Sequence, residues 1–280
     1  MNDIHSGSLS PGQVVFIGDD YLAGFMDGAL YREGQQHGIS EILSGTLSQG
    51  GMESLVQADI GSEKGYNEYA SDSASIRGRY ISVLTGIDPE PMITTLPGEI
   101  PGDYTGDRSL LNDLTVPFLK SFQFDMSNVI GNKYLSRILE NPGSLSLISQ
   151  AGNRQPETFV LWVGMTDLLN YAVSGGMGDT LPPSDPGLIG KTDLTPLPVF
   201  RFVLENMVSI LLTNPEANGT IFTLPSFDDL PFFYYYTYDF MKLTGAQLGL
   251  ARTFYADFND AVLQNNMTPV SYTHLTLPTN

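Results

Sequence analysis

The sequence predicts an α/β fold with a mostly parallel sheet, and three observations predict it. Short apolar runs at residues 14–17 and 158–164 have the length and composition of buried strands, and residues 219–225 predict a third strand. Segments with apolar residues at helical spacing separate these runs, and strands that alternate with helices form parallel sheets through right-handed crossovers. The third observation is the chain length of 280 residues, which is enough for one α/β domain with a full core.

The first strand reads VVFI at residues 14–17 and runs directly into Gly-Asp-Asp. The segment ISEILSGTL at residues 39–47 places its isoleucines and a leucine on one helical stripe, which predicts a helix. Residues 51–106 are rich in Gly, Pro, Ser, Asp and Glu and show weak periodicity. We therefore predict a long loop or insertion there.

The middle of the chain contains the next strands and helices. DLTVP at residues 113–117 is a short strand candidate, and NKYLSRILENPG at residues 132–143 is a helix candidate closed by Pro and Gly. TFVLWVG at residues 158–164 is the second clear buried strand, and its Trp162 is interpreted as a packing residue. A helix is expected over residues 166–173, followed by a turn in which GGMG lacks the context of a phosphate-binding loop.

The remaining elements complete the alternation. Residues 182–198 are rich in proline and predict a loop, and residues 199–214 predict a packing helix. GTIFTLP at residues 219–225 is the third strand, and residues 246–266 predict the last helix. The residues of that helix expected to face inward are Leu248, Ala251, Phe254, Phe258 and Val262.

The composition excludes several classes of function. The formal net charge of −18 repels phosphate backbones and anionic membranes, so we expect no binding to nucleic acid. The absence of cysteine rules out disulfides, thiol nucleophiles and cysteine-based metal sites. No run of about 18 apolar residues is present, so we expect no transmembrane segment, and the N-terminal sequence does not have the pattern of a signal peptide.

The last residues, VSYTHLTLPTN, resemble an in-frame translation of a sequencing adapter. We therefore expect residues 1–269 to form a single domain that is incomplete at its C-terminus, and residues 270–280 to be a poorly packed, non-native tail. The alternative is a natural polar tail. On the first interpretation, His274 is not a candidate for catalysis.

The strand ends carry the most specific residues, because sites in parallel sheets form at the carboxyl ends of strands. The blocks IGDDYLAGFMDGALYREGQ, NDLTVPFLK and LWVGMTDLLNYAVSGG follow one another in the order seen in the SGNH (GDSL) hydrolase superfamily, and they resemble most a branch found in Bacteroidetes-type bacteria. TIFTLPSFDDLPFF also resembles a later strand and loop of that branch. The resemblance extends over about residues 14–265.

The resemblance implies a flavodoxin-like three-layer α/β/α sandwich. It implies an ester hydrolase lineage of esterases, lipases and carbohydrate deacetylases, whose ligands are small-molecule esters or glycan esters. It implies no cofactor and no metal, and an exported bacterial protein if the N-terminus is incomplete. In this family a serine attacks the ester, a histidine takes its proton, and N–H donors hold the oxyanion.

The matching positions of this chain depart from that pattern. Asp20 occupies the serine position, Phe118 the position of the oxyanion glycine, and Thr166 the position of the oxyanion asparagine. The histidine of the family belongs to a C-terminal Asp-x-x-His block, and we expect this chain to end before that block. His5 and His37 lie in the wrong part of the chain. The frame residues of the blocks are retained, namely Gly18, Asp19, Gly164 and Asp167.

These departures predict little or no serine esterase activity, as in a pseudoenzyme. A carboxylate at position 20 has no proton to give to a base, and its charge would repel an oxyanion. The alternative function is noncatalytic binding of a ligand or partner in the old active-site cleft. A third possibility is that Asp20 itself is a nucleophile, as carboxylates are in some hydrolases.

Two other features leave alternatives open. Asp19, Asp20 and Asp167 are expected to converge at the strand ends. Three carboxylates could be ligands for Mg²⁺ or Ca²⁺. The interpretation favoured here is a hydrogen-bonded structure in which Asp19 and Asp167 hold loops. The aromatic run DLPFFYYYTYDF at residues 229–240 is interpreted as core and pocket lining rather than as a platform for carbohydrate or lipid.

Overall fold

The computed structural model describes residues 12–84, 92–129, 131–226, 229–230, 244–254 and 256. The chain divides into two compact units, residues 1–224 and 225–280, and each is described by itself. The first unit contains the sheet and all the candidate site residues.

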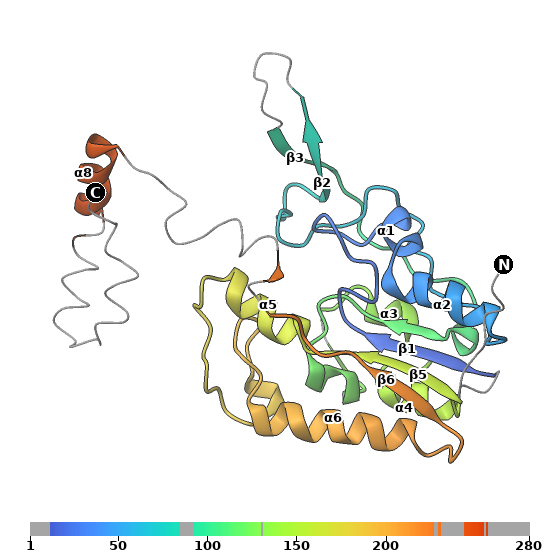
Figure 1. Ribbon diagram of the computed structural model, residues 1–280. Coiled ribbons are helices and arrows are strands. Elements are labelled where there is room, and N and C mark those ends of the chain that lie inside the picture. The colour runs from blue at the N-terminus through green and yellow to red at the C-terminus, as the bar shows by residue number, and fades with distance from the viewer. Residues whose placement is uncertain are drawn as a thin grey trace. The chain divides into compact units, whose positions relative to one another are not determined.

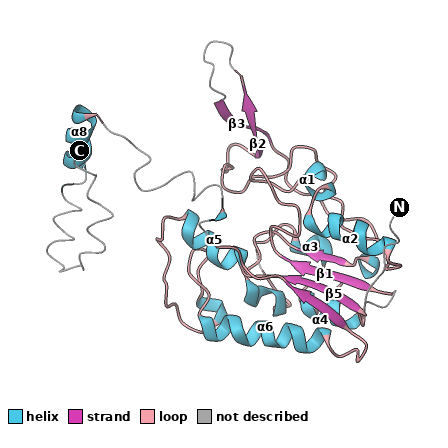
Figure 2. Ribbon diagram, in the orientation of Figure 1, coloured by secondary structure: helices cyan, strands magenta, loops and turns pink. Residues whose placement is uncertain are grey.

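The first unit is built on a parallel sheet of four strands (Figures 1 and 2). The strands are β1 (Val14–Gly18), β4 (Asp113–Thr115), β5 (Thr158–Trp162) and β6 (Asn218–Ile221). Their order across the sheet is β4-β1-β5-β6, and every neighbouring pair is parallel. The predicted α/β fold with a mostly parallel sheet is therefore confirmed.

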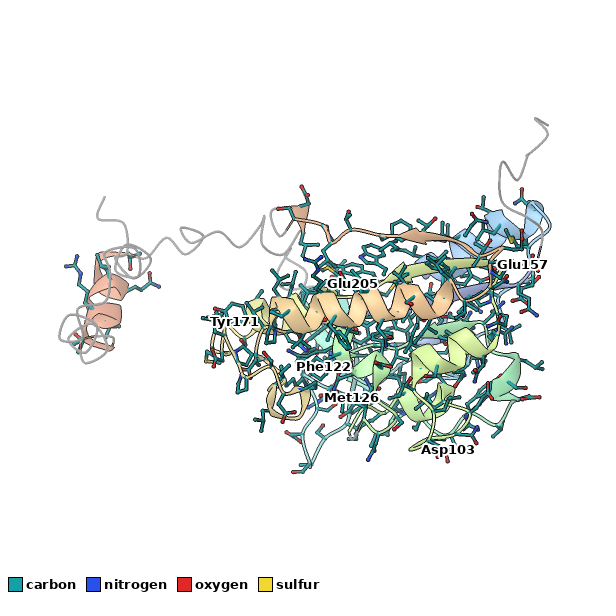
Figure 3. The ribbon with its side chains drawn as sticks, turned by 90° about the horizontal axis from the view of Figure 1, so that it is seen from below. Asp103, Phe122, Met126, Glu157, Tyr171 and Glu205 are labelled. Carbon is teal, nitrogen blue, oxygen red and sulfur yellow. The ribbon has the colours of Figure 1, made fainter. Side chains whose placement is uncertain are left out.

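Side chains of β1 are buried on both faces of the sheet, which explains its unbroken apolar sequence. Val15 and Ile17 belong to a large core cluster on one face, and Val14 and Phe16 belong to a smaller cluster on the other. The large cluster includes residues of α4 (Leu147–Asn153) and α6 (Leu197–Leu211), and Figure 3 shows α6 running across the molecule. Residues of α2 (Ile39–Gln49) pack against the smaller cluster. Helices thus cover both faces of the sheet.

The other elements are short. Those of the first unit are α1 (Arg32–Gln36), η1 (Arg108–Leu110), η2 (Ser121–Asp125), α3 (Leu135–Ile138), α5 (Met165–Val173) and η3 (Pro186–Leu188). The described helix of the second unit is α8 (Gly245–Phe254).

The segment 51–106, predicted as a long loop or insertion, contains one pair of strands that was not predicted. An antiparallel hairpin of β2 (Arg77–Val83) and β3 (Met92–Pro97) lies within it (Figure 2). Most of its residues are exposed or half-buried, and the pairing contains an irregularity between Arg77 and Tyr80. Because the hairpin buries little on either face, its sequence lacks the alternation that identifies a strand.

The helix predicted over residues 132–143 is also shorter than expected. Only α3 is helical there, because Leu139 adopts an extended backbone and its side chain is buried in the core. A second helix, α4, follows and was not predicted; the side chain of Ser146 accepts a hydrogen bond from its first turn. The third strand ends at Ile221 rather than at residue 225.

Several predictions concern the second unit or the chain ends. Within α8, Leu248 is half-buried, whereas the other residues expected to face inward have no described side chain. Residues 231–240 of the aromatic run and the tail at 270–280 lie outside the described residues, as do His5 and His274. The extent of a single domain to residue 269 stays a prediction. Within the described part of the chain, no helix has both the length and the hydropathy needed to cross a bilayer.

Candidate active site

The three predicted site residues, one after each of three neighbouring strands, lie in direct contact. One carboxylate oxygen of Asp20, Oδ1, accepts a hydrogen bond of 2.8 Å from the backbone N–H of Phe118. The other, Oδ2, accepts one of 3.2 Å from the hydroxyl of Thr166. The prediction that these three residues cluster at one edge of the sheet is confirmed. The cluster lies beside β1 and β5, where the strand order reverses, which is the usual place for a ligand site in open α/β sheets.

Phe118 has a backbone conformation that favours glycine. Its φ is 61°, in the left-handed region, which costs a residue with a side chain about 1 kcal/mol or more. This is the position that the family resemblance assigns to a glycine. The ring of Phe118 packs against Phe25, Tyr69 and Tyr134, with centroid distances of 4.7, 5.5 and 6.3 Å. Aromatic packing therefore holds a strained backbone whose N–H is directed at Asp20.

Thr166 lies in the first turn of α5, just after Gly164. The φ of Gly164 is 108°, and an added Cβ would meet the ring of Phe200 at 2.8 Å, so this position requires glycine. The turn brings the N–H groups of Gly164 and Thr166 to the same oxygen of Asp19, each at 3.1 Å. Asp19 thereby supplies, from the end of another strand, the acceptor that the free N–H groups of a helix N-terminus need.

Asp167 connects α5 to two other segments. Its carboxylate accepts hydrogen bonds from the N–H of Ser121 at 2.8 Å, from the hydroxyl of Ser121 at 2.9 Å, and from the hydroxyl of Thr195. All of these atoms except those of Thr195 are buried. Asp19 and Asp167 therefore hold loops through hydrogen bonds, as the interpretation favoured from the sequence expected.

Burial raises the pKa of both carboxyl groups that follow β1. The pKa of Asp20 rises from 3.8 to about 6, because desolvation outweighs the hydrogen bonds from Phe118 and Thr166. The pKa of Asp19 is raised well above its ordinary value, first by burial and then by the charge of Asp20. The second oxygen of Asp19 has no hydrogen-bond partner among the described residues. The charge of Asp20 thus disfavours ionisation of the buried Asp19.

The described residues provide no histidine to act as a base at this site. His37 is the only histidine among them, and it is exposed, with its ring Nδ1 2.8 Å from the backbone carbonyl oxygen of Glu33. Tyr21, which follows Asp20, stacks on Trp162 with a centroid distance of 5.4 Å. Burial raises the pKa of its phenol, so it is not poised to accept a proton. Trp162 also contacts Phe222, in agreement with its predicted packing role.

The carboxylates do not form a metal site in the part of the chain that the structure describes. No group of three or more His, Asp or Glu side chains is arranged there to hold an ion. The carboxylate oxygens of Asp167 face hydroxyl and N–H donors instead of the other two carboxylates.

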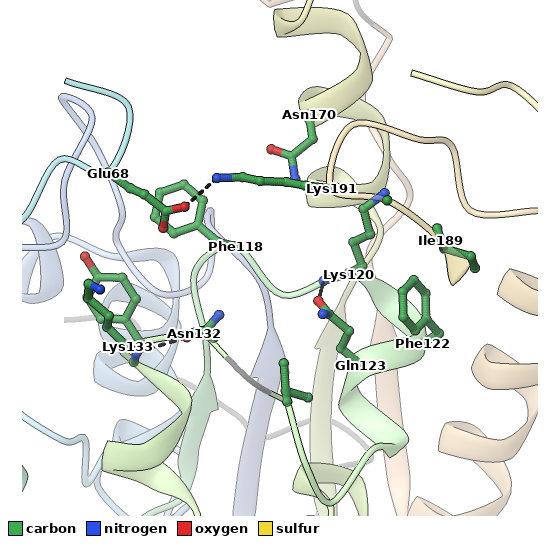
Figure 4. Close-up of a pocket in the computed structure, with 14 residues that line it drawn as sticks. Glu68, Phe118, Lys120, Phe122, Gln123, Asn132, Lys133, Asn170, Ile189 and Lys191 are labelled. Atoms are coloured by element: carbon green, nitrogen blue, oxygen red, sulfur yellow. Dashed lines mark hydrogen bonds and ion pairs between the residues drawn. The ribbon is translucent and has the colours of Figure 1, made fainter. Parts of the chain in front are cut away.

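A cavity of about 270 Å³ lies next to the cluster, with Phe118 in its wall (Figure 4). Its charged lining residues are Glu68, Lys120, Lys133 and Lys191, and none of them was singled out from the sequence. They come from separate segments, so nothing in their spacing along the chain indicates a common site. The only sequence signal is the scarcity of lysine in the whole chain.

No family model matches this chain, and neither a curated protein nor a solved structure matches it. The chemistry of the site must therefore be inferred from its own geometry.

Proposed function

We propose that this chain is an SGNH-type protein of the ester hydrolase lineage that has little or no serine esterase activity. The proposal includes the finer fold assignment, a flavodoxin-like α/β/α sandwich. Numbered along the chain, the sheet strands stand in the order 2-1-3-4, which agrees with the first four strands of the flavodoxin-like order. The helices on both faces of the sheet support the same assignment.

The observation that carries the proposal is the position of the Asp20 carboxylate. In an acyl-transfer site of this lineage, donors at positions 118 and 166 would stabilise the oxyanion of the tetrahedral intermediate. Here the N–H of Phe118 and the hydroxyl of Thr166 both donate to Asp20 instead. The side chain at the nucleophile position therefore occupies the donors that the reaction would need.

The energetic consequence is large enough to suppress catalysis. A substrate oxyanion would have to displace hydrogen bonds to a charged group, each worth about 1.5–3 kcal/mol, while lying next to that same negative charge. The loss of one oxyanion donor alone typically costs a factor of about 10² to 10³ in rate. Position 20 also lacks the serine hydroxyl that would form the attacking alkoxide. Serine esterase chemistry therefore has neither its nucleophile nor the donors that stabilise its oxyanion.

A second candidate function is noncatalytic binding of a ligand or partner in the same cleft. The cavity beside Phe118 favours it, because a cavity lined by converging polar groups is suited to a small molecule whether or not chemistry follows.

The test is hydrolysis of p-nitrophenyl acetate by the purified wild type and the Asp20→Ala variant. The expected result is background hydrolysis by both. The matched control is Glu216→Ala, which removes an exposed carboxylate from a loop. Because it is purified in the same way, any hydrolysis by contaminating host-cell esterases should appear equally in this variant. Turnover by the wild type and Glu216→Ala that disappears in Asp20→Ala would overturn the proposal and make Asp20 a working nucleophile.

A second variant asks whether the nucleophile alone is missing. Asp20→Ser provides a hydroxyl and frees both donors, but no described histidine contacts this position to take the proton. We expect Asp20→Ser to remain at background, and Asp20→Ser combined with Thr166→Asn to do the same in this chain. Full esterase activity of Asp20→Ser would contradict this expectation.

A further inference from the structure

Most lysines of this acidic protein lie at one cavity. The chain has five lysines, at positions 64, 120, 133, 191 and 242, and a formal net charge of −18. Three of the five, Lys120, Lys133 and Lys191, line the cavity of about 270 Å³ beside Phe118 (Figure 4). One carboxylate, that of Glu68, also lines it, so three positive charges and one negative charge leave the wall at +2. The sign of this wall is opposite to that of the molecule.

Lys120 is the buried member of the group, with 3% of its surface exposed. Its ammonium donates to the backbone carbonyl of Asp193, and this is its only hydrogen bond among the described residues. An ammonium group has three donors, so two remain for another acceptor. Burial lowers the pKa of Lys120 although the charges of Asp167 and Asp193 oppose this shift, so its charge is only partly compensated, and a bound anion would offset the remaining cost.

The other two lysines differ in how far they are already neutralised. Lys191 pairs with Glu68 and lies over the rings of Tyr69 and Phe118, at 5.1 and 6.0 Å from their centroids. Lys133 lies over the ring of Tyr66 at 5.2 Å and has no ion-pair partner among the described residues. Lys133 is therefore the cation in this wall most available to a ligand.

The rest of the wall provides neutral donors and a flat apolar surface. In the described part of the chain, the side-chain amide nitrogens of Gln123 and Asn170 have no hydrogen-bond acceptor, although their oxygens accept from Lys120 N–H and the Tyr69 hydroxyl. Phe118, Phe122 and Tyr134 also line the cavity and supply aromatic surface. Ligand sites for drug-sized molecules begin at about 300 Å³, so this cavity suits a body of about one ring.

We propose that this cavity binds a small organic anion, a single ring that carries a carboxylate or a phosphate group. The lysine ammonium groups and the free amide N–H groups would receive the anionic group, and the aromatic side chains would contact the ring. The proposal does not rest on the inactivity of Asp20, since it concerns other atoms and another measurement.

The experiment is isothermal titration calorimetry on the full chain at pH 7.5 and low salt, because exposed lysines are screened by salt. Benzoate and phenyl phosphate are the two anionic probes, and they distinguish a carboxylate from a phosphate site. Benzamide is the neutral probe of the same shape as benzoate, and benzylamine is the cationic one. We expect at least one of the anions to bind about tenfold or more tightly than benzamide, and benzylamine to show no binding.

Lysine variants locate the binding. Lys133→Gln and Lys191→Gln should each weaken the tighter anion about tenfold, which is the effect of losing one charge-assisted hydrogen bond. The matched control is Lys64→Gln, because Lys64 is an exposed lysine paired with Glu99 and does not line the cavity. It should leave the affinity unchanged. Equal binding of benzoate and benzamide, no binding of either anion, or equal losses in all three variants would overturn the proposal.

A labelling measurement on the wild type avoids any effect of the variants on folding. Acetic anhydride acetylates free lysines, and mass spectrometry of the digested protein gives the extent at each position. Saturating anion should protect the exposed lysines Lys133 and Lys191 several-fold and leave Lys64 as reactive as before. Protection of Lys64 to the same extent, or of no lysine, would contradict the assignment of the anion to this cavity.

Discussion

Replacing Asp20 with asparagine should stabilise the protein at high pH and not at low pH. Burial raises the pKa of Asp20 from 3.8 to about 6, so the folded state retains a proton that the unfolded state has lost between these values. The stability contributed by this group is therefore greatest below pH 3.8 and falls as the pH rises to about 6. Above pH 6 the folded protein carries the full cost of the buried charge.

The size of the effect follows from the pKa. A rise from 3.8 to about 6 corresponds to about 3 kcal/mol, since one unit of pKa is worth 1.36 kcal/mol. Asp20 keeps some exposure to solvent, which reduces the cost, so we expect about 1–3 kcal/mol. Asparagine preserves the shape: its oxygen accepts from the N–H of Phe118, and its amide donates to the hydroxyl oxygen of Thr166.

The assay is urea unfolding of the wild type and Asp20→Asn at pH 4, 6 and 8. The fluorescence of Trp162, the only tryptophan, reports the region of the site directly. The free energy of unfolding of the variant should exceed that of the wild type by about 1–3 kcal/mol at pH 8 and match it within about 0.5 kcal/mol at pH 4. A variant less stable than the wild type at pH 8 would mean that the charged carboxylate is a favourable acceptor and that its burial carries no net cost.

Three further substitutions test the roles of other residues in and near the site. Asp113→Asn should show the same pH-dependent stabilisation, because burial raises the pKa of Asp113 to about 6 outside the catalytic positions; an equal effect at pH 4 and pH 8 in urea unfolding would speak against it. Asp167→Ala should destabilise the protein by about 2–4 kcal/mol, since it leaves the buried N–H of Ser121 without an acceptor; a loss under 0.5 kcal/mol in the same assay would contradict this role. Phe118→Gly should be more stable than Phe118→Ala by about 1 kcal/mol, the reverse of the usual order, because φ at this position is 61°; the usual order in thermal melts would exclude backbone strain there.

The strands that position the site could be predicted because each is buried on both faces. The runs at 14–18 and 158–162 are apolar without interruption, and a residue that follows such a strand lies at the carboxyl edge of the sheet. The contact between Asp20, Phe118 and Thr166 follows from that rule. The β2–β3 hairpin buries too little apolar surface to mark the sequence, so it could not be found in the same way.

The chemistry of the site depended on details that no pattern contains. The sequence placed a carboxylate near two donors, but only the structure gives both hydrogen bonds to the same carboxylate. The lysine wall was missed because Lys120, Lys133 and Lys191 are brought together by folded loops. Such convergence is set by tertiary packing and leaves no periodicity in the sequence. The helix α4 is a different case, since Leu147, Ile148 and Ala151 have helical spacing after a Ser N-cap, and this pattern does predict a helix.

A pH titration of the Phe118 amide by ¹H–¹⁵N nuclear magnetic resonance tests whether the Asp20 carboxylate accepts the hydrogen bond of that N–H. An N–H that donates to a carboxylate at 2.8 Å changes its chemical shift when the carboxylate gains a proton. The Phe118 amide of the wild type should therefore titrate with a midpoint near pH 6, and this titration should be absent in Asp20→Asn. A Phe118 amide that does not move between pH 4 and pH 8, or that moves equally in Asp20→Asn, would contradict the account.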